Sequence, residues 1–455
     1  MQEFFGSIWW LIVSLGVLVT FHEFGHYWVA RKCGVKVLRF SVGFGRALWK
    51  RVGKDGTEYV IAAIPLGGYV KMLDEREEEV PAAQLDQAFN RKSVGQRFAI
   101  VLAGPAFNLL LCLGLLWGMF VIGKADFVPV VGRSQGLAAE AGLRADDRIV
   151  SIDGRGMDTW THAALALTGA ALDREPVNLE VHGSDGVTRQ LEFDFAKLGE
   201  KFDETTVLRD IGIVPKQVLL PAVIGKVAID TPAARAGLRA GDRVERIGTV
   251  AIEDWNQITR EVQAQADQPG KDPAALNLTV LRGADRFRLD VAPESRTEGD
   301  STRWVIGIEP QPRDARYDAV LRYGPIDAVG ASVKETWRLT EATFGMLWRM
   351  INGSASLQNL SGPISIAQYA NASAELGVAW FLFFLAVLSL SLCIMNLLPI
   401  PILDGGHLLY YLVEMVKGSP VSERFMLAGQ YVGMALLAGL MGLAFYNDIV
   451  RLVSS

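Results

Sequence analysis

Four long apolar runs without any Asp, Glu, Lys or Arg limit what this 455-residue chain can fold into. Each run has roughly 18 residues or more, which is enough for a helix to cross the hydrocarbon core of a bilayer. The sequence therefore predicts four transmembrane helices, at residues 4–21, 98–123, 376–403 and 425–447. The first run follows Met-Gln-Glu, which is not the basic start of a signal peptide, so we expect this helix to be retained.

The distribution of basic residues predicts how these helices are oriented. About 13 Lys and Arg residues lie between residues 31 and 97, whereas the tip before the first run has none. Short loops that are rich in Lys and Arg stay on the cytoplasmic side of a membrane. We therefore expect both termini and the long segment at about 125–375 on the opposite, periplasmic face, with the membrane lipids as a partner.

The composition argues against two other classes of protein. Half of the residues are hydrophobic and 21% are charged, which is too apolar for a purely cytosolic globular enzyme. The formal net charge of −5 provides no basic field for a phosphate backbone, so we expect no nucleic-acid partner.

The long segment between the second and third runs contains an internal repeat. Residues 138–149 (AAEAGLRADDRI) match residues 233–244 (AARAGLRAGDRV) at an offset of about 95. The same offset pairs Trp160 with Trp255, and the Ile-Gly-Ile at 211–213 with that at 306–308. This pattern predicts two tandem copies of one small domain.

The repeated pattern resembles PDZ domains of the bacterial, circularly permuted kind. In that family it forms a short helix, a turn and a strand, and the Ile-Gly-Ile segment borders a groove that takes an extended peptide as an added strand. The resemblance implies α+β domains at 125–215 and 216–311. The grooves either capture peptides or belong to a gate that excludes bulky substrates, and the same residues are also needed simply to build the fold.

The first run ends in an H-E-x-x-H motif, formed by His22, Glu23 and His26. On a helix, residues four apart share a face, so both imidazoles can reach one Zn²⁺ ion while Glu23 is placed to take a proton from bound water. Polar groups near the end of a membrane helix are costly, by roughly 2.5–3.5 kcal/mol for an ionised carboxylate at the bilayer centre. The alternative is a hydrogen-bonded cluster between helices without a metal.

Two histidines leave a catalytic zinc ion one protein ligand short. The end of the third run offers Asp404 and His407, which follow Pro399 and Pro401. The two prolines interrupt the helix and free backbone groups that must then line protein or water. Spacing alone does not decide between Asp404 and His407.

The segment at 35–72 alternates apolar and polar residues and is punctuated by glycines, which predicts a β-hairpin. It is too apolar for a plain cytosolic loop, although a small cytosolic hairpin with Gly43 and Gly45 as turns remains the alternative. Between residues 317 and 348, apolar residues recur at helical spacing, as in Val333, Trp337 and Phe344. This spacing predicts amphipathic helices near the outer interface.

The H-E-x-x-H motif together with the N-x-x-P-x-P-x-L-D-G pattern at 396–405 resembles the site-2 family of intramembrane zinc metalloproteases. Because it has two tandem PDZ-like copies, the chain is similar to the members of this family that regulate the sigma-E response of Gram-negative bacteria. The resemblance extends over the whole chain, including Gly104-Pro105-Ala106-Phe107-Asn108. It implies a polytopic α-helical membrane protein with four transmembrane helices, a membrane-associated β-hairpin and two inserted PDZ domains.

The resemblance also implies which residues act. It makes His22, His26 and Asp404 the ligands of one zinc ion per chain and Glu23 the general base, with His407 a neighbour of the site. It implies substrate contacts by the following residues: Asn396, Gly43, Gly45, Tyr69, Pro399 and Pro401. For Asn396, a hydrogen bond between helices without substrate contact is the rival interpretation.

By the same resemblance, the chain is an inner-membrane endopeptidase with its active site toward the cytoplasm. Its substrates would be single-pass membrane proteins, such as a pre-trimmed anti-sigma factor, and remnant signal peptides. Residues 1–124 and 376–455 would form the catalytic membrane halves, and residues 312–375 an amphipathic linker. A membrane scaffold without activity is disfavoured by Glu23, and a metal transporter by the lack of inverted repeats.

Overall fold

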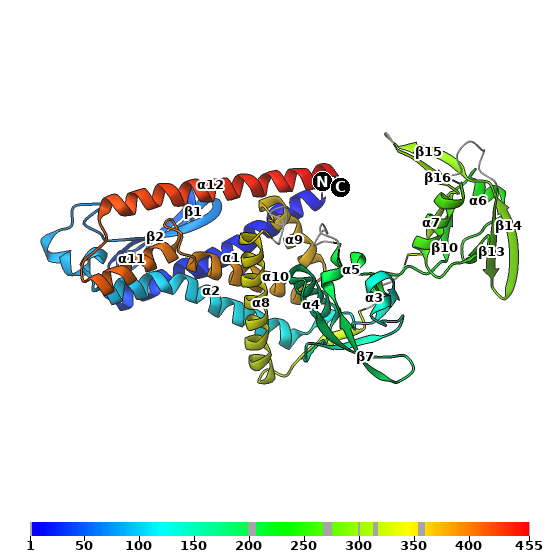
Figure 1. Ribbon diagram of the computed structural model, residues 1–455. Coiled ribbons are helices and arrows are strands. Elements are labelled where there is room, and N and C mark those ends of the chain that lie inside the picture. Colours follow the sequence, from blue (N-terminus) through cyan, green and yellow to red (C-terminus); the bar gives the residue numbers. More distant parts are fainter. Residues whose placement is uncertain are drawn as a thin grey trace. The chain divides into compact units, whose positions relative to one another are not determined.

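The computed structural model describes residues 2–198, 206–266, 275–298, 301–312, 317–353 and 360–454. The chain divides into two compact units. Residues 1–125 and 320–455 form the first, here called the membrane unit, and residues 126–319 form the second, here called the inserted unit (Figure 1).

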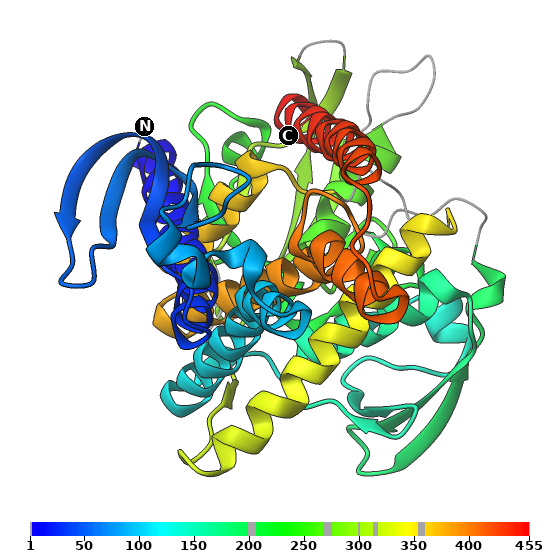
Figure 2. The ribbon, with the colours of Figure 1, turned by 90° about the vertical axis from the view of Figure 1, so that its left-hand side faces the viewer.

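Four helices of the membrane unit are long and apolar enough to cross a bilayer, which confirms the number of spans predicted from the sequence. Within this unit their axes are roughly aligned, with α1 and α10 running opposite to α2 and α12, and Figure 2 views them nearly end-on. Their bounds are α1 Gln2–Lys32, α2 Val94–Ile122, α10 Val378–Leu397 and α12 Glu423–Ser454.

The third predicted span, 376–403, is too long. Its helix α10 begins only after Gly377, whose φ is 111°, and ends at Leu397, because the next residues lead into Pro399 and Pro401. Proline lacks an N–H group and disfavours helical backbone in the residue before it. The chain then turns through 398–403 and enters α11 (Asp404–Lys417).

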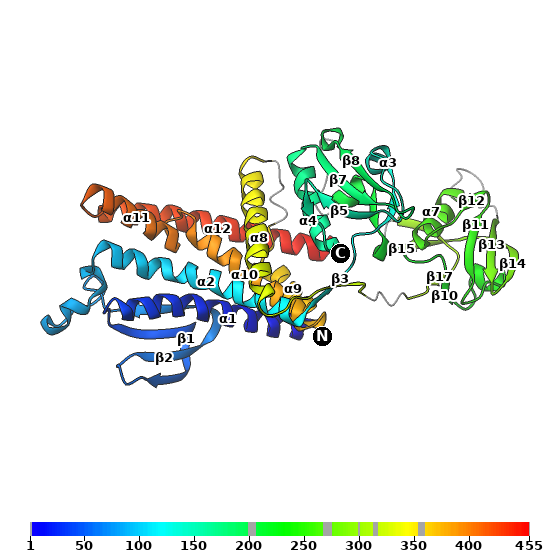
Figure 3. The same cartoon turned by 90° about the horizontal axis from the view of Figure 1, so that it is seen from below.

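Strands β1 (Val37–Val52) and β2 (Glu58–Met72) form the predicted hairpin, and β2 packs along α1 (Figure 3). Both strands bend. Residues 39–42 of β1 pair with 58–61 and also with 68–71, while residues 47–52 pair with 58–62. The hairpin therefore folds back into a small sheet of four segments. Gly43 and Gly45 lie at the bend in β1, where their φ values are 91° and 86°.

Two further helices complete the membrane unit. Helix α8 (Asp327–Ile351) crosses the four long helices (Figures 1 and 3). It packs on α2 and exposes Val329, Val333 and Trp337 at successive turns, as expected for an amphipathic helix. Helix α9 (Pro363–Glu375) packs on α1 and α10.

The inserted unit repeats one architecture twice. The first copy contains a four-stranded sheet of order β6-β5-β7-β8 and a separate pair β4-β9, and the second copy repeats this with β12-β11-β13-β14 and β10-β17. Strands of the first copy are β4 Val131–Ser134, β5 Arg148–Ile152, β6 Arg155–Gly156, β7 Val177–His182, β8 Thr188–Phe193 and β9 Ile213–Pro215. Strands of the second are β10 Ile224–Val227, β11 Arg243–Ile247, β12 Val250–Ala251, β13 Leu276–Arg282, β14 Asp285–Val291, β15 Glu294–Glu298, β16 Ser301–Val305 and β17 Ile308–Pro310.

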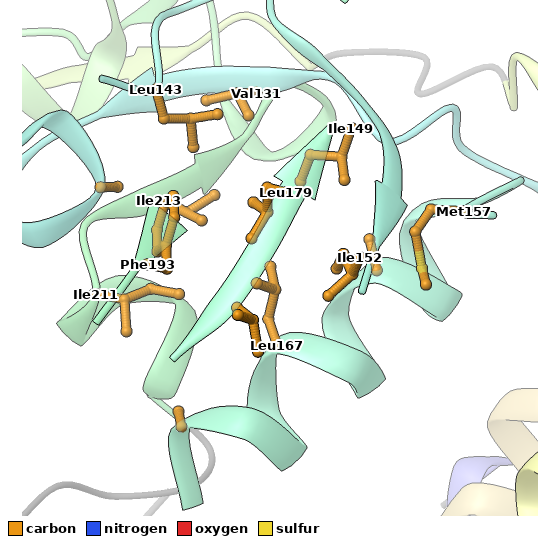
Figure 4. Close-up of a cluster of buried hydrophobic side chains, with 14 of the residues drawn as sticks. Val131, Leu143, Ile149, Ile152, Met157, Leu167, Leu179, Phe193, Ile211 and Ile213 are labelled. Carbon is orange, nitrogen blue, oxygen red and sulfur yellow. The ribbon is translucent and has the colours of Figure 1, made fainter. Parts of the chain in front are cut away.

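The helices follow the repeat as well. Short helices α3 (Gly136–Glu140) and α6 (Pro232–Arg235) begin the repeated motif, and α4 (Trp160–Asp173) corresponds to α7 (Trp255–Ala266). Helix α5 (Val207–Asp210) precedes β9 in the first copy, where the second copy has the β15–β16 hairpin. Each copy has its own apolar core; in the first, Ile149, Leu179 and Ile213 of three strands meet Leu167 of α4 (Figure 4).

Candidate metal centre

Helix α1 carries three polar residues of the centre within two turns. It is apolar over most of its length, and the H-E-x-x-H motif lies toward its C-terminal end. The four-residue spacing places the rings of His22 and His26 on one face, with their centroids 4.8 Å apart.

Asp404, the first residue of α11, completes a tight cluster with the two histidines. The Oδ2 atom of Asp404 lies 3.2 Å from Nε2 of His22 and 3.5 Å from Nε2 of His26, and the two nitrogens are 3.3 Å apart. In a tetrahedral site with zinc–nitrogen distances of about 2.0–2.1 Å, ligand atoms lie about 3.3 Å from each other. The three atoms are therefore spaced as zinc ligands would be.

The hydrogen bonds around the histidines decide which ring nitrogens face the cluster. Nδ1 of His26 lies 2.8 Å from the carbonyl oxygen of Ile100, so it must carry the proton and donate. Nε2 of His26 is then unprotonated and turns a lone pair toward Asp404. This is the tautomer that a metal ligand needs.

For His22, the hydrogen-bond partner that decides which ring nitrogen carries the proton is Asn108 of α2. Nδ1 of His22 lies 3.2 Å from the side-chain nitrogen of Asn108, while Oδ1 of that amide is buried and has no partner among the described residues. If the amide is turned by 180°, Nδ1 of His22 donates to Oδ1 of Asn108. His22 then also presents an unprotonated Nε2.

With both rings neutral, three lone-pair atoms thus converge without a proton between them. Oδ2 of Asp404 is buried, and no donor group of the described part of the chain is directed at it. Buried polar atoms without partners cost free energy, and a cation at the centre of the cluster would satisfy all three at once. The residues therefore fit a zinc ion.

Gly104 of α2 supplies the space for the two imidazoles. A Cβ atom at this position would lie 2.3 Å from Nε2 of His26 and 2.7 Å from Cε1 of His22, closer than such atoms approach. Only glycine lets α2 pass the histidines at this distance.

Glu23 lies on the side of α1 that faces the hairpin. A Cβ atom on Gly68 of β2 would be 2.9 Å from Cγ1 of Val19 and 3.2 Å from Cγ of Glu23, so the strand passes close to this carboxylate. The backbone N–H of Val70 lies within hydrogen-bonding reach of Glu23. The candidate base therefore contacts the part of β2 that follows Gly67.

The remaining predicted residues lie at different places. Asn396 is half-buried in the last turn of α10, and Pro399 and Pro401 lie in the turn that leads to Asp404. Tyr69 accepts a hydrogen bond from Arg39 at 3.2 Å. The residues nearest to Gly43 are Ala62 and Ile64 of β2, so the structure does not bring Gly43 to the histidines.

His407 points away from the cluster. It lines a cavity of about 470 Å³ between α2, α11 and α12, together with Tyr410, Arg97 and Glu414. Arg97 and Glu414 form an ion pair of 2.8 Å in this cavity. The cavity therefore begins one helical turn from Asp404.

Sequence reasoning assigned no role to three residues of the centre, Gly104, Asn108 and Gly68. Gly104 and Asn108 belong to the motif that carried the family resemblance, which was the only signal available for them. Their contacts with the histidines depend on how α2 packs against α1, and no local pattern predicts this packing.

Comparisons with known proteins identify the family of this chain. Residues 10–440 match the model of Peptidase family M50. A protein of Xylella fastidiosa (strain 9a5c), named provisionally as a zinc metalloprotease, is 52% identical over 452 residues, 99% of this chain and 100% of that protein. Regulator of sigma-E protease RseP of Escherichia coli (strain K12) is 42% identical over 457 residues, again 99% and 100% of the two chains. The chain therefore belongs to Peptidase family M50 and is a zinc metalloprotease.

Proposed function

We propose that this protein hydrolyses a peptide bond within or near the transmembrane segment of single-pass membrane proteins. One observation carries the proposal: two histidine nitrogens of a helix that is apolar and long enough to span a membrane converge with a carboxylate oxygen of Asp404 at the start of α11. In this proposal His22, His26 and Asp404 bind one zinc ion per chain. Glu23, next to His22 in the chain, is the general base.

Bound zinc would hold a water molecule, lower its pKa and polarise the scissile carbonyl group. Glu23 would act as the general base, accepting a proton from the attacking water and passing it to the leaving amine. His26, held by Ile100, and His22, held by Asn108, keep their rings in the orientation that this chemistry requires. The proton of each ring then points away from the ligand cluster.

A substrate helix must be unwound before it is cut, because its carbonyl groups are engaged in the helix. The segment 68–71 of β2 lies beside Glu23, and an extended substrate could pair with backbone there. We assign Tyr69 to this contact, and Gly43 and Gly45 to the bend that shapes the sheet. Asn396, Pro399 and Pro401 would border the substrate from the side of Asp404.

Water must reach a site that lies between membrane helices. Three charged residues, Arg76, Arg97 and Glu414, are among those that line the cavity at His407. Because it begins one turn beyond Asp404, it would offer a short route from the basic loop at 31–97. By the positive-inside rule, we expect that loop on the cytoplasmic side.

The names of the relatives support a wider role. We place the chain in the bacterial inner membrane, with both termini and the inserted unit in the periplasm. The substrates would be a pre-trimmed anti-sigma factor in envelope stress signalling and, second, remnant signal peptides. The two copies would be PDZ domains, at 125–215 and 216–311, that exclude substrates with bulky outer domains.

A reconstituted cleavage assay tests the proposal. The substrate is a single-pass membrane protein truncated on its outer side, and the enzyme is the full chain in proteoliposomes. Cleavage should disappear in Glu23→Gln and with a zinc chelator, and should persist in Glu77→Gln, which alters an exposed glutamate of the same unit. Undiminished cleavage in Glu23→Gln and with the chelator would contradict the mechanism.

A further inference from the structure

The hairpin leaves one edge of its small sheet open. The order of segments across the sheet is 68–71, 39–42, 58–62 and 47–52, and the last segment has no second neighbour among the described residues. A strand with one neighbour leaves every second N–H and C=O group unpaired. The hairpin projects from α1 away from the other long helices (Figure 2), so this open edge, residues 47–52, faces outward.

An ion pair places the open edge near the end of α1. The turn that follows it carries Asp55, whose Oδ2 lies 2.9 Å from Nη1 of Arg31 in the last turn of α1. Lipid-exposed sheet edges do not occur in the hydrocarbon core of a bilayer, because nothing there satisfies the unpaired backbone groups. We therefore place the open edge at the membrane–water interface, where headgroups and water supply partners.

Basic side chains without partners follow the open edge. The two acidic residues of the hairpin are already engaged, Asp55 by Arg31, and Glu58 by Arg39 and Lys50. The other basic residues at 46–54 are exposed and form no ion pair or hydrogen bond with any residue that the structure describes: Arg46, Arg51 and Lys54. The edge therefore carries a positive charge that the hairpin itself does not neutralise.

Exposed apolar side chains lie between these cations. Leu48, Trp49 and Val52 are 70%, 49% and 58% exposed. Trp is enriched at membrane–water interfaces, and basic residues beside exposed apolar ones are typical of surfaces that lie in the headgroup region. The segment thus combines contacts for acyl chains with contacts for anions.

A second copy of the chain is a poorer occupant of this edge. Pairing two such edges would bring the cations of both chains together, and like charges that face each other destabilise a sheet. An anionic headgroup supplies the opposite charge, and its phosphate oxygens accept hydrogen bonds from guanidinium groups and from backbone N–H groups. Charge complementarity therefore favours a lipid.

We propose that the open edge at 47–52 binds anionic phospholipids. The phosphate groups contact Arg46, Arg51 and Lys54, and the acyl chains contact the exposed apolar side chains of the same segment. The lipid holds the hairpin at the interface from its outer edge, while the opposite edge, 68–71, stays beside Glu23. The proposal rests on the membrane placement of α1 and not on the proposed proteolysis.

Native mass spectrometry of the full chain in detergent micelles tests the proposal. The probes are dioleoylphosphatidylglycerol, which is anionic, and dioleoylphosphatidylcholine, which is zwitterionic. The anionic lipid should bind at least about tenfold more tightly, because each basic residue near a headgroup adds to the attraction. The triple variant Arg46→Gln/Arg51→Gln/Lys54→Gln should reduce this preference to less than about twofold. Equal affinity of wild type for the two lipids would overturn the proposal.

A matched triple variant separates the edge from net charge. Arg243→Gln/Arg260→Gln/Arg288→Gln removes three exposed cations of the inserted unit and should keep the full preference, with both triple variants unfolding at the wild-type temperature. Loss of the preference in this control as well would contradict the assignment to the hairpin. A dimer that disappears only in the hairpin variant would assign the edge to a second copy instead. Glu23→Gln should bind lipid as wild type does, so this outcome is independent of catalysis.

Discussion

Two carboxylates of the membrane unit, Asp448 and Asp404, differ in the hydrogen-bond donors that surround them. Asp448 of α12 is 1% exposed, and its oxygens accept four hydrogen bonds from Gly362, Ile364 and Ser365 at the start of α9. Asp404 instead turns a buried oxygen toward two histidine lone pairs. Backbone and hydroxyl donors fix Asp448, whereas Asp404 faces two histidines with which it could share a cation, so we infer that Asp448 stabilises the fold and Asp404 binds the metal.

The largest effect should follow from removing Asp448. In Asp448→Ala, the N–H groups that begin α9 lose their acceptor in a buried place, and α12 loses its attachment to α9. We expect the free energy of unfolding to fall by about 3–5 kcal/mol. Denaturation of the full chain in mixed micelles measures this, and unchanged stability would remove the contrast between the two carboxylates.

Gly104→Ala should damage the metal centre without unfolding the protein. The added methyl group collides with both imidazoles, so zinc affinity should fall by about a hundredfold. A competitive titration against a chelator measures the affinity. Gly114→Ala on the same helix is the control, because a Cβ atom there meets nothing within 4 Å. Equal zinc affinity in the two variants would show that α2 does not approach the histidines.

Asn108→Ala should have a smaller effect of the same kind. The ring of His22 loses the partner that orients it, and zinc affinity should fall by about tenfold. Asn108→Asp should restore much of the affinity, because a carboxylate also accepts the proton of Nδ1. If neither variant changes the affinity, the interaction between Asn108 and His22 has no part in metal binding.

Asp404→Asn should have the smallest effect on stability in metal-free protein. Besides Nε2 of the two histidines, its buried oxygen has no partner among the described residues, so the free energy of unfolding should change by less than about 1 kcal/mol. Unfolding in the presence of a chelator checks this. A loss as large as that in Asp448→Ala would mean that Asp404 is also a structural residue.

Much of this fold follows from local patterns in the sequence. Apolar length predicts the four spanning helices, the four-residue spacing predicts the histidine pair, and the repeat predicts two similar copies. The end of α10 was misplaced because an uncharged run continues through Pro399 and Pro401, although the helix does not. The difference between α5 and β16 was not predicted, because the repeat extends over the Ile-Gly-Ile segments but not over the residues before them.

The choice between Asp404 and His407 lay beyond sequence patterns for a physical reason. Both residues follow the same turn, and the direction in which α11 leaves it decides which side chain faces α1. A close approach of backbone sets that direction, since a Cβ atom on Gly405 would lie 2.1 Å from the carbonyl oxygen of Leu398. The packing of α2 against α1, which places Asn108 and Gly104 beside the histidines, is equally non-local.

Zinc content of the purified full chain tests the central claim most directly. Wild type, Asp404→Asn and His407→Asn are each loaded with zinc, dialysed and analysed by mass spectrometry of the metal. We predict about one zinc ion per chain in wild type and in His407→Asn, and close to none in Asp404→Asn. Zinc retained in Asp404→Asn, with loss confined to His407→Asn, would contradict the proposed centre.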